Sequence, residues 1–183
     1  MLHAQDILVT LKLLTASSVE KANYAALAAS VELSTSETHA AVQRAVASGL
    51  VRSDEDRPML SQMRPSAAAI HDLLCFGVRY FLPATLGAPG RGILTATSAP
   101  PLLGKIIPDD NPPYVWAFAR GQAKGVTVTP IYPSAPAAAQ RDPKLAEWLA
   151  LVDALRLNYG RVADLARQEI RTRLSRPTHA AAA

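Results

Sequence analysis

The stretch from Tyr24 to Val51, YAALAASVELSTSETHAAVQRAVASGLV, decides the fold, because it predicts two short helices separated by a tight turn. Ser34 and Glu37 form a Ser-x-x-Glu capping box, which begins a helix by satisfying its free backbone amides. The second helix therefore begins near Thr35, and Gly49 ends it as a left-handed cap. Its inward positions, at helical spacing, are Thr38, Ala41, Val42, Ala45 and Val46.

The order of these features resembles the winged helix-turn-helix of bacterial regulators of the MarR type. The matching positions are Leu27, Ala28, Leu33, Ser34, Gly49, Leu50 and Val51, so the resemblance covers about the first third of the chain. The chain departs from the family pattern at Glu32, where the turn glycine is usual, and at Thr38, where a larger aliphatic residue is usual. The resemblance implies a winged domain with a following helix over residues 1–82. The alternative is an ordinary two-helix segment of an all-α core.

The flanking residues complete this expected domain. Apolar residues at helical spacing predict a first helix over Ala4–Leu14, and the polar segment 15–22 predicts a loop. A hairpin, the wing, is expected with strands at Leu50–Ser53 and Met59–Gln62 and a tip at Asp54–Pro58. The tip is acidic, so it is either a solvated turn or a wing whose phosphate contacts come only from its flanking arginines, Arg52, Arg57 and Arg64.

A helix over residues 66–81 is expected next, and its inward positions are Ile70, Leu73, Leu74, Gly77, Val78 and Phe81. Eleven of the fourteen prolines then lie between Pro83 and Pro143, which excludes long helices there. Residues 83–142 are therefore predicted to be irregular, with short strands at Ile93–Thr95, Tyr114–Phe118 and Gly125–Thr129, the last two forming a hairpin. The aromatic residues of this segment, Tyr114, Trp116, Phe118 and Tyr132, favour a minor core over a ligand pocket.

The C-terminal part predicts an αα-hairpin over residues 143–176, followed by a flexible tail at 177–183. Asp142 and Pro143 supply an N-cap and a proline at the first helical position. The expected fold class is thus mainly α with small β: an N-terminal winged helix-turn-helix, a Pro-rich segment with short strands, and a C-terminal helical hairpin.

The net charge of +4 suggests a nucleic-acid partner, but this charge is distributed unevenly along the chain. Residues 1–65 carry six Lys and Arg against seven Asp and Glu, a net charge of −1, while residues 143–183 carry a net charge of +3. Nonspecific DNA affinity comes mainly from cations at phosphates, so this distribution counts against tight binding by an isolated N-terminal domain.

The sequence contains no complete motif of the enzyme or metal-binding classes considered. The glycine-rich segment 87–92, GAPGRG, lacks the Gly-Lys-Ser/Thr ending of a phosphate loop, and no Gly-x-Ser-x-Gly elbow exists. The four histidines share no metal-ligand spacing, and the single cysteine, Cys75, lies in an apolar run typical of a buried thiol. We therefore expect no catalysis, no metal, no cofactor and no membrane span. A cytoplasmic location is expected, and the bias towards Ala, Pro and Arg favours a bacterial source.

The first functional hypothesis is sequence-specific binding of double-stranded DNA by a homodimeric transcription regulator. The helix after the turn would enter the major groove, with the wing on the phosphates. The residues expected to contact DNA are Thr35, Ser36, His39, Ala40, Gln43, Arg44, Arg52 and Arg57. The alternative is a winged-helix protein-interaction module, such as an antitoxin-like or regulatory subunit encoded beside its partner, which accounts better for the acidic wing.

Overall fold

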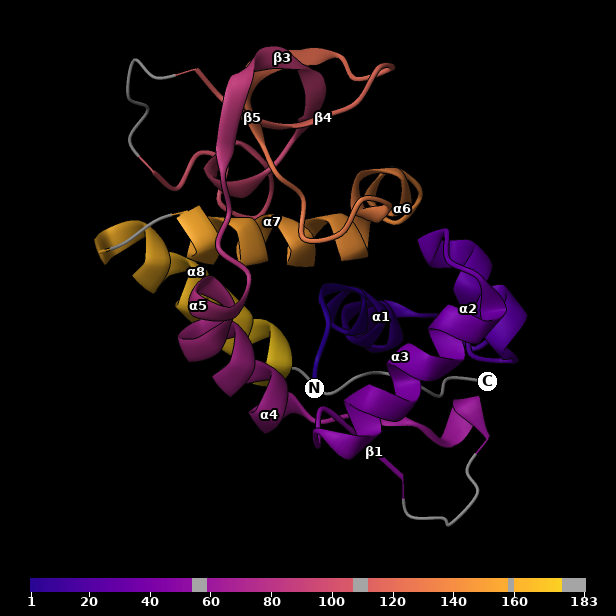
Figure 1. Ribbon diagram of the computed structural model, residues 1–183. Helices are drawn as coiled ribbons and strands as arrows, with labels where there is room; N and C mark the ends of the chain where they lie inside the picture. The colour runs from indigo at the N-terminus through magenta and orange to yellow at the C-terminus, as the bar shows by residue number, and fades with distance from the viewer. Residues whose placement is uncertain (54–58, 107–111, 158–159, 176–183) are drawn as a thin grey trace.

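The computed structural model describes residues 1–53, 59–106, 112–157 and 160–175, and it is mainly helical with small β elements (Figure 1). The chain begins with α1 (Ala4–Thr15), α2 (Tyr24–Val31) and α3 (Thr35–Ala47). The last two are the helices predicted around the tight turn. Ser34 Oγ accepts a hydrogen bond from the Glu37 amide at 3.2 Å, and Glu37 accepts one from the Ser34 amide at 3.1 Å. The predicted capping box is confirmed, as is the left-handed cap at Gly49, whose φ is 75°.

A two-stranded antiparallel sheet follows α3, formed by β1 (Val51–Arg52) and β2 (Arg64–Pro65). The second strand expected at residues 59–62 is wrong, because this segment forms the 3₁₀-helix η1 (Leu60–Gln62). Leu60 and Met63 are both buried, and a 3₁₀ turn brings positions i and i+3 to the same side, whereas a strand would point them to opposite faces. The expected tip at residues 54–58 lies outside the described residues.

The helix expected over residues 66–81 is present but interrupted. It consists of α4 (Ala67–Asp72), a π-helical turn η2 (Leu73–Gly77) and α5 (Val78–Phe81). Ile70, Leu74 and Val78 are buried as predicted. The expectation for Phe81 is wrong, since this side chain is 40% exposed. A π turn holds an extra residue, so it rotates the following residues away from the face that regular helical spacing predicts.

The Pro-rich segment builds a closed three-stranded barrel from β3 (Leu86–Leu94), β4 (Tyr114–Ala117) and β5 (Ala123–Val128). The hairpin predicted between the last two strands is wrong: β4 and β5 run parallel, and β3 is antiparallel to both. Ala117 and Ala123 both pair with Gly92. A Cβ at Gly92 would lie 1.9 Å from the Trp116 carbonyl oxygen, so the missing side chain is what allows the backbones to meet there.

The 3₁₀-helix η3 (Ala96–Ser98) joins the barrel to the helices below it. Three helices complete the fold: α6 (Ala135–Arg141), α7 (Pro143–Leu157) and α8 (Gly160–Ser175). Helices α7 and α8 are the predicted αα-hairpin, and Asp142 caps α7 by accepting from the Lys144 and Leu145 amides at 3.0 and 3.1 Å. The short helix α6 was not predicted. It tolerates Pro136 because that proline lies in its first turn, where the missing amide has no helical partner.

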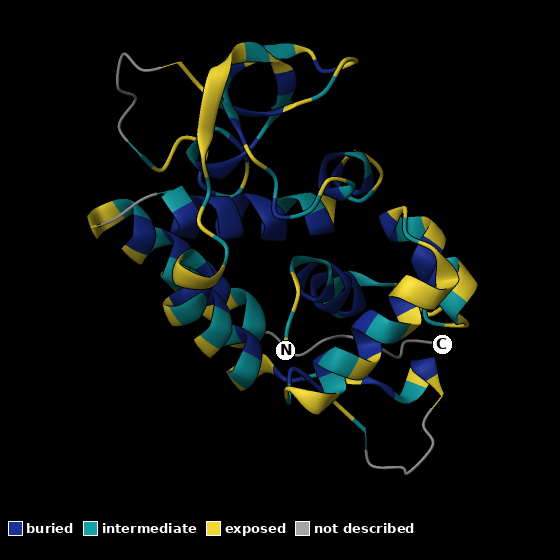
Figure 2. Ribbon diagram, viewed as in Figure 1, coloured by how far each residue is buried: buried dark blue, intermediate teal, exposed yellow. Residues whose placement is uncertain are grey.

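Helix α7 is the centre of the molecule. It packs against α1, α5, α6, α8 and η3, and it is buried along most of its length (Figure 2). One continuous cluster of buried side chains includes residues of α1, α3, α7 and the barrel. The division into residues 1–82, 83–142 and 143–176 remains a prediction. Within the described ranges, no helix is long and apolar enough to cross a membrane.

Candidate nucleic-acid interface

The outward face of α3 carries the polar residues that the sequence predicts to contact DNA. Thr35, Ser36, His39 and Gln43 are exposed, and Ala40 is half-buried. The His39 ring lies edge-on to Tyr24 of α2, with 4.9 Å between ring centroids. Burial raises the pKa of Tyr24, although the nearby Gln43 side chain acts to lower it, so the Tyr24 hydroxyl remains a neutral donor and acceptor beside α3. Tyr24 was missed as a site residue, because its place beside α3 depends on the crossing of the two helices.

Arg44 occupies a different environment from the rest of this face. Its Nε and Nη2 donate to the two carboxylate oxygens of Asp6 at 2.9 and 2.7 Å, and the Asp6 side chain is fully buried. Asp6 also accepts from the His3 amide at 2.8 Å. This two-point contact ties α3 to α1. A role for Arg44 at DNA stays a prediction, but its substitution would leave a buried carboxylate without its cation and would disturb the fold as well as any ligand.

The sheet after α3 presents two arginines on neighbouring strands. Arg52 pairs directly with Arg64 in the β1–β2 register, and both residues are exposed. Arg64 also faces Lys21, whose pKa is lowered first by burial and then by the Arg64 charge. Like charges placed opposite each other in a sheet are destabilising unless an anion lies nearby. We call Lys21, Arg52 and Arg64 the basic cluster. The third predicted wing residue, Arg57, lies outside the described residues.

Most of the described acidic residues of the N-terminal region are held in internal contacts. Asp6 binds Arg44, Glu20 binds Lys12 at 2.6 Å, and Glu32 binds Arg141 at 2.7 Å. The side chain of Glu37 remains in the capping box with Ser34, which lowers its pKa. The same contacts occupy Lys12 and Arg44, and they leave Lys21, Arg52 and Arg64 without an acidic partner among the described residues.

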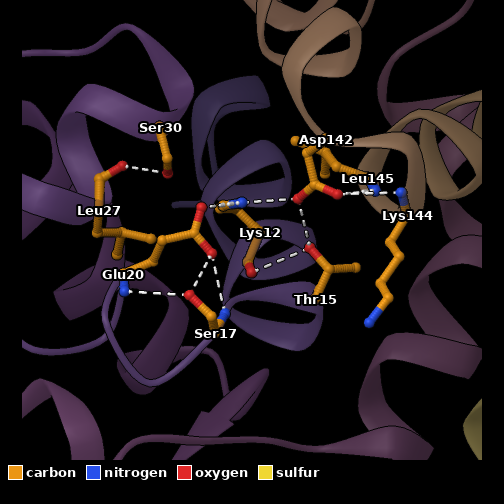
Figure 3. Close-up of polar contacts among 9 residues, drawn as sticks. All are labelled: Lys12, Thr15, Ser17, Glu20, Leu27, Ser30, Asp142, Lys144 and Leu145. Atoms are coloured by element: carbon orange, nitrogen blue, oxygen red, sulfur yellow. Dashed lines mark hydrogen bonds and ion pairs between the residues drawn. The ribbon is translucent and has the colours of Figure 1, made fainter.

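Lys12 anchors the helices beneath this surface (Figure 3). Its Nζ lies 2.6 Å from both Glu20 and Asp142, and its side chain is only 2% exposed. Burial acts to raise the pKa of each carboxyl, but the hydrogen bonds and charge of Lys12, together with backbone amides, outweigh burial and lower both pKa values. Ser134 Oγ also donates to the Val31 carbonyl at 2.6 Å. Helix α1 is thus tied to the loop before α2 and to the start of α7, and the end of α2 is tied to the start of α6.

A second buried polar network joins the barrel to α7. Asp153 accepts hydrogen bonds from Thr95 at 2.8 Å, Trp116 at 2.6 Å and Arg156 at 2.6 Å. Arg156 also donates to the Leu82 and Thr129 carbonyls. Burial raises the pKa of Asp153, while the three donors favour its charged form. Arg156 contributes to the positive net charge of residues 143–183, yet it is buried and stabilises the fold.

The described residues contain no group of three or more His, Cys, Asp or Glu side chains that could hold a metal ion. Cys75 is buried, and burial raises the pKa of its thiol. A high pKa keeps the sulfur in the unreactive thiol form. Comparison of the chain with protein-family models, with curated proteins and with solved structures finds no match. The chemistry of the surface therefore carries the functional argument.

Proposed function

We propose that residues 1–82 form a winged helix-turn-helix domain that binds double-stranded DNA sequence-specifically, and that the protein is a bacterial transcription regulator. The observation that carries the proposal is the exposed polar face of α3 beside the opposed arginines of β1 and β2. In this arrangement α3 enters the major groove and the two strands lie along the phosphates.

The side chains of α3 have the hydrogen-bonding groups that base edges require. Gln43 can bond an adenine through its amide, Thr35 and Ser36 can bond a base or a phosphate, and Ala40 can contact a thymine methyl group. His39 adds a ring nitrogen on the same face. The basic cluster supplies phosphate contacts that position α3 without reading sequence. Because Arg44 is occupied by Asp6, base reading in this proposal depends on neutral side chains.

The proposal includes a homodimer, which doubles the phosphate contacts available to one operator. Support comes from an aromatic surface on the helix of residues 67–81, where Phe76, Tyr80 and Phe81 are 60%, 78% and 40% exposed. Large apolar side chains exposed on one helical segment favour an interface. Helix α7 is largely buried within the chain, so the proposed interface does not include it.

The test begins with selection from a random double-stranded DNA library, followed by fluorescence anisotropy on the enriched sequence. The paired substitution Ser36→Ala and Gln43→Ala should weaken binding to that sequence by roughly tenfold or more and leave binding to random DNA unchanged. The pair Arg52→Gln and Arg64→Gln should weaken binding to both DNAs. Because a homodimer carries four of these arginines, the pair should also reduce the slope of log K against log salt by about 3.6, near 0.9 for each phosphate that is no longer neutralised. Arg161→Gln, an exposed arginine on α8, is the matched charge control.

Failure to enrich any sequence, together with no binding at low salt, would rule out this function and favour a protein partner. Arg44→Ala is unsuitable as the main variant. Weaker DNA binding by this variant could result from a lost DNA contact or from the lost ion pair with Asp6. Light scattering of the free protein should give twice the 19.5 kDa of one chain, and a monomer at micromolar concentration would contradict the dimer.

A further inference from the structure

A cleft of about 450 Å³ lies between the barrel and helices α6 and α7. Its walls come from β3, from residues 99–100, from residues 120–123, which lead into β5, from Gln140 of α6 and from the start of α7. Figure 1 shows the barrel lying on one side of α7. Small-molecule sites occupy roughly 300–1,000 Å³. A smaller void, among Ile7, Leu11 and Leu74, measures about 10 Å³, enough for a single water at most.

The lining of the cleft combines apolar walls with polar side chains that have no hydrogen-bond partner among the described residues. Ile93 and Ala146 are half-buried on opposite walls. The side chains of Arg120, Gln122 and Gln140 line the cleft and make no hydrogen bond or ion pair with any described residue. This differs from the basic residues of α8 that pair with acids, such as Arg167 with Asp164.

The charges at the cleft favour an anionic ligand. Its one acidic lining residue, Glu147, is already paired with Arg173 at 2.8 Å, whereas Arg120 is exposed and has no anion beside it among the described residues. An arginine can bind a carboxylate or sulfonate through two parallel N–H donors. The two glutamine amides add neutral donors and acceptors at the same opening.

We propose that this cleft binds a small organic anion with an apolar body, whose charged group contacts Arg120 and whose body packs between Ile93 and Ala146. The site is separate from α3 and the basic cluster, and it does not depend on the proposed DNA binding. It is also distinct from the aromatic surface of residues 76–81.

The test uses two fluorescent probes with the same ring system, 8-anilinonaphthalene-1-sulfonate and the uncharged N-phenyl-1-naphthylamine. The wild-type protein should bind both in saturable one-to-one fashion. Arg120→Gln should weaken the sulfonate about tenfold, as expected when one charge-assisted hydrogen bond is removed, and change the neutral probe less than about twofold. Arg161→Gln removes one exposed arginine on α8 and should change neither affinity.

A second pair of variants locates the apolar part of the site. Ala146→Trp or Gln140→Trp fills the cleft and should abolish binding of both probes, with circular dichroism showing that each variant is folded. Equal sulfonate affinity in wild type and Arg120→Gln would overturn the proposal. A second result would also overturn the proposal: the Trp variants bind both probes normally, and the double variant Phe76→Ser with Tyr80→Ser binds neither probe. The probes would then lie on the aromatic surface and not in the cleft.

Discussion

Glu32 and Thr38 each carry a local cost in free energy. Glu32 adopts a left-handed backbone, with φ 55°, at the position where a turn glycine is usual. Thr38 is fully buried, and its hydroxyl has no hydrogen-bond partner among the described residues. An aliphatic side chain at the same position would have no polar atom to satisfy. These departures do not prevent the two helices from forming, because the caps and the apolar contacts remain.

Thr38→Val should stabilise the protein. Valine has nearly the shape of threonine and removes a buried hydroxyl that has no partner, so the free energy of unfolding should rise by about 1 kcal/mol. The matched control is Thr10→Val, since Thr10 is equally buried in a helix but donates to the Asp6 carbonyl at 2.7 Å. Urea unfolding measures both. A gain for Thr10→Val as large as that for Thr38→Val would show that the missing hydrogen bond is not the cause.

The barrel is the element whose geometry depends most on glycine. Gly92 and Gly125 lie where a Cβ would come within 1.9 Å of a backbone carbonyl oxygen, and a Cβ at Gly121 would lie 2.2 Å from the Gly92 carbonyl oxygen. The three strands can therefore close on one another over a very short circumference. The sequence GAPGRG, which resembles a phosphate loop in composition, is instead part of β3, and its last glycine allows this crossing.

Gly92→Ala should destabilise the protein by about 3 kcal/mol or prevent the barrel from closing, because the clash is with backbone and cannot be relieved by a rotamer change. Gly90→Ala is the control on the same strand, where the nearest atom is a Thr127 methyl carbon at 3.1 Å. That variant should cost less than about 1 kcal/mol. Near-ultraviolet circular dichroism and urea unfolding measure the difference, and similar values for the two variants would contradict the crossing geometry.

At the scale of the whole molecule, buried charged residues join parts of the chain that are distant in sequence, through ion pairs and hydrogen bonds. Lys12 connects α1 to the loop at Glu20 and to Asp142 at the start of α7, and Asp153 with Arg156 connects α7 to the barrel. The proposed DNA-binding helices are therefore fixed to the remainder of the chain through charged contacts as well as through apolar packing. Such contacts make the free energy of unfolding of the protein depend on pH.

The Lys12–Asp142 pair should weaken in acid. The pKa of Asp142 is lowered in the folded protein, so its contribution to stability is present above the unfolded aspartate pKa of about 3.9 and disappears as the pH falls through the folded value. Asp142→Asn keeps the helix cap but removes the charge, and it should cost about 2 kcal/mol at pH 7. This difference from wild type should shrink below about pH 4.

Urea midpoints between pH 3 and pH 7 measure this effect. Asp164→Asn is the control, because the Asp164 side chain is 72% exposed in its pair with Arg167, and removing its charge should cost less than about 0.5 kcal/mol at any pH. A wild-type advantage over Asp142→Asn that stayed constant down to pH 3 would show that the missing charge does not cause the destabilisation.

The sequence alone determined the local elements. The capping box at Ser34, the left-handed cap at Gly49 and the Asp142 cap with Pro143 form between residues a few positions apart, so their chemistry is readable in the chain. The exposed face of α3 follows from helical spacing for the same reason. The proline-rich composition correctly excluded long helices from residues 83–142.

Only the tertiary structure decided the partners of the charged residues and the topology of the barrel. Arg44 pairs with Asp6 across 38 positions, and Lys12 reaches Asp142 across 130 positions, so a count of charges could not show which remain free at the surface. The parallel course of β4 and β5 depends on close backbone contacts at glycines that only the folded chain brings together. Local chemistry was therefore predictable because its cause is local, whereas charge pairing and strand order depend on which distant segments meet.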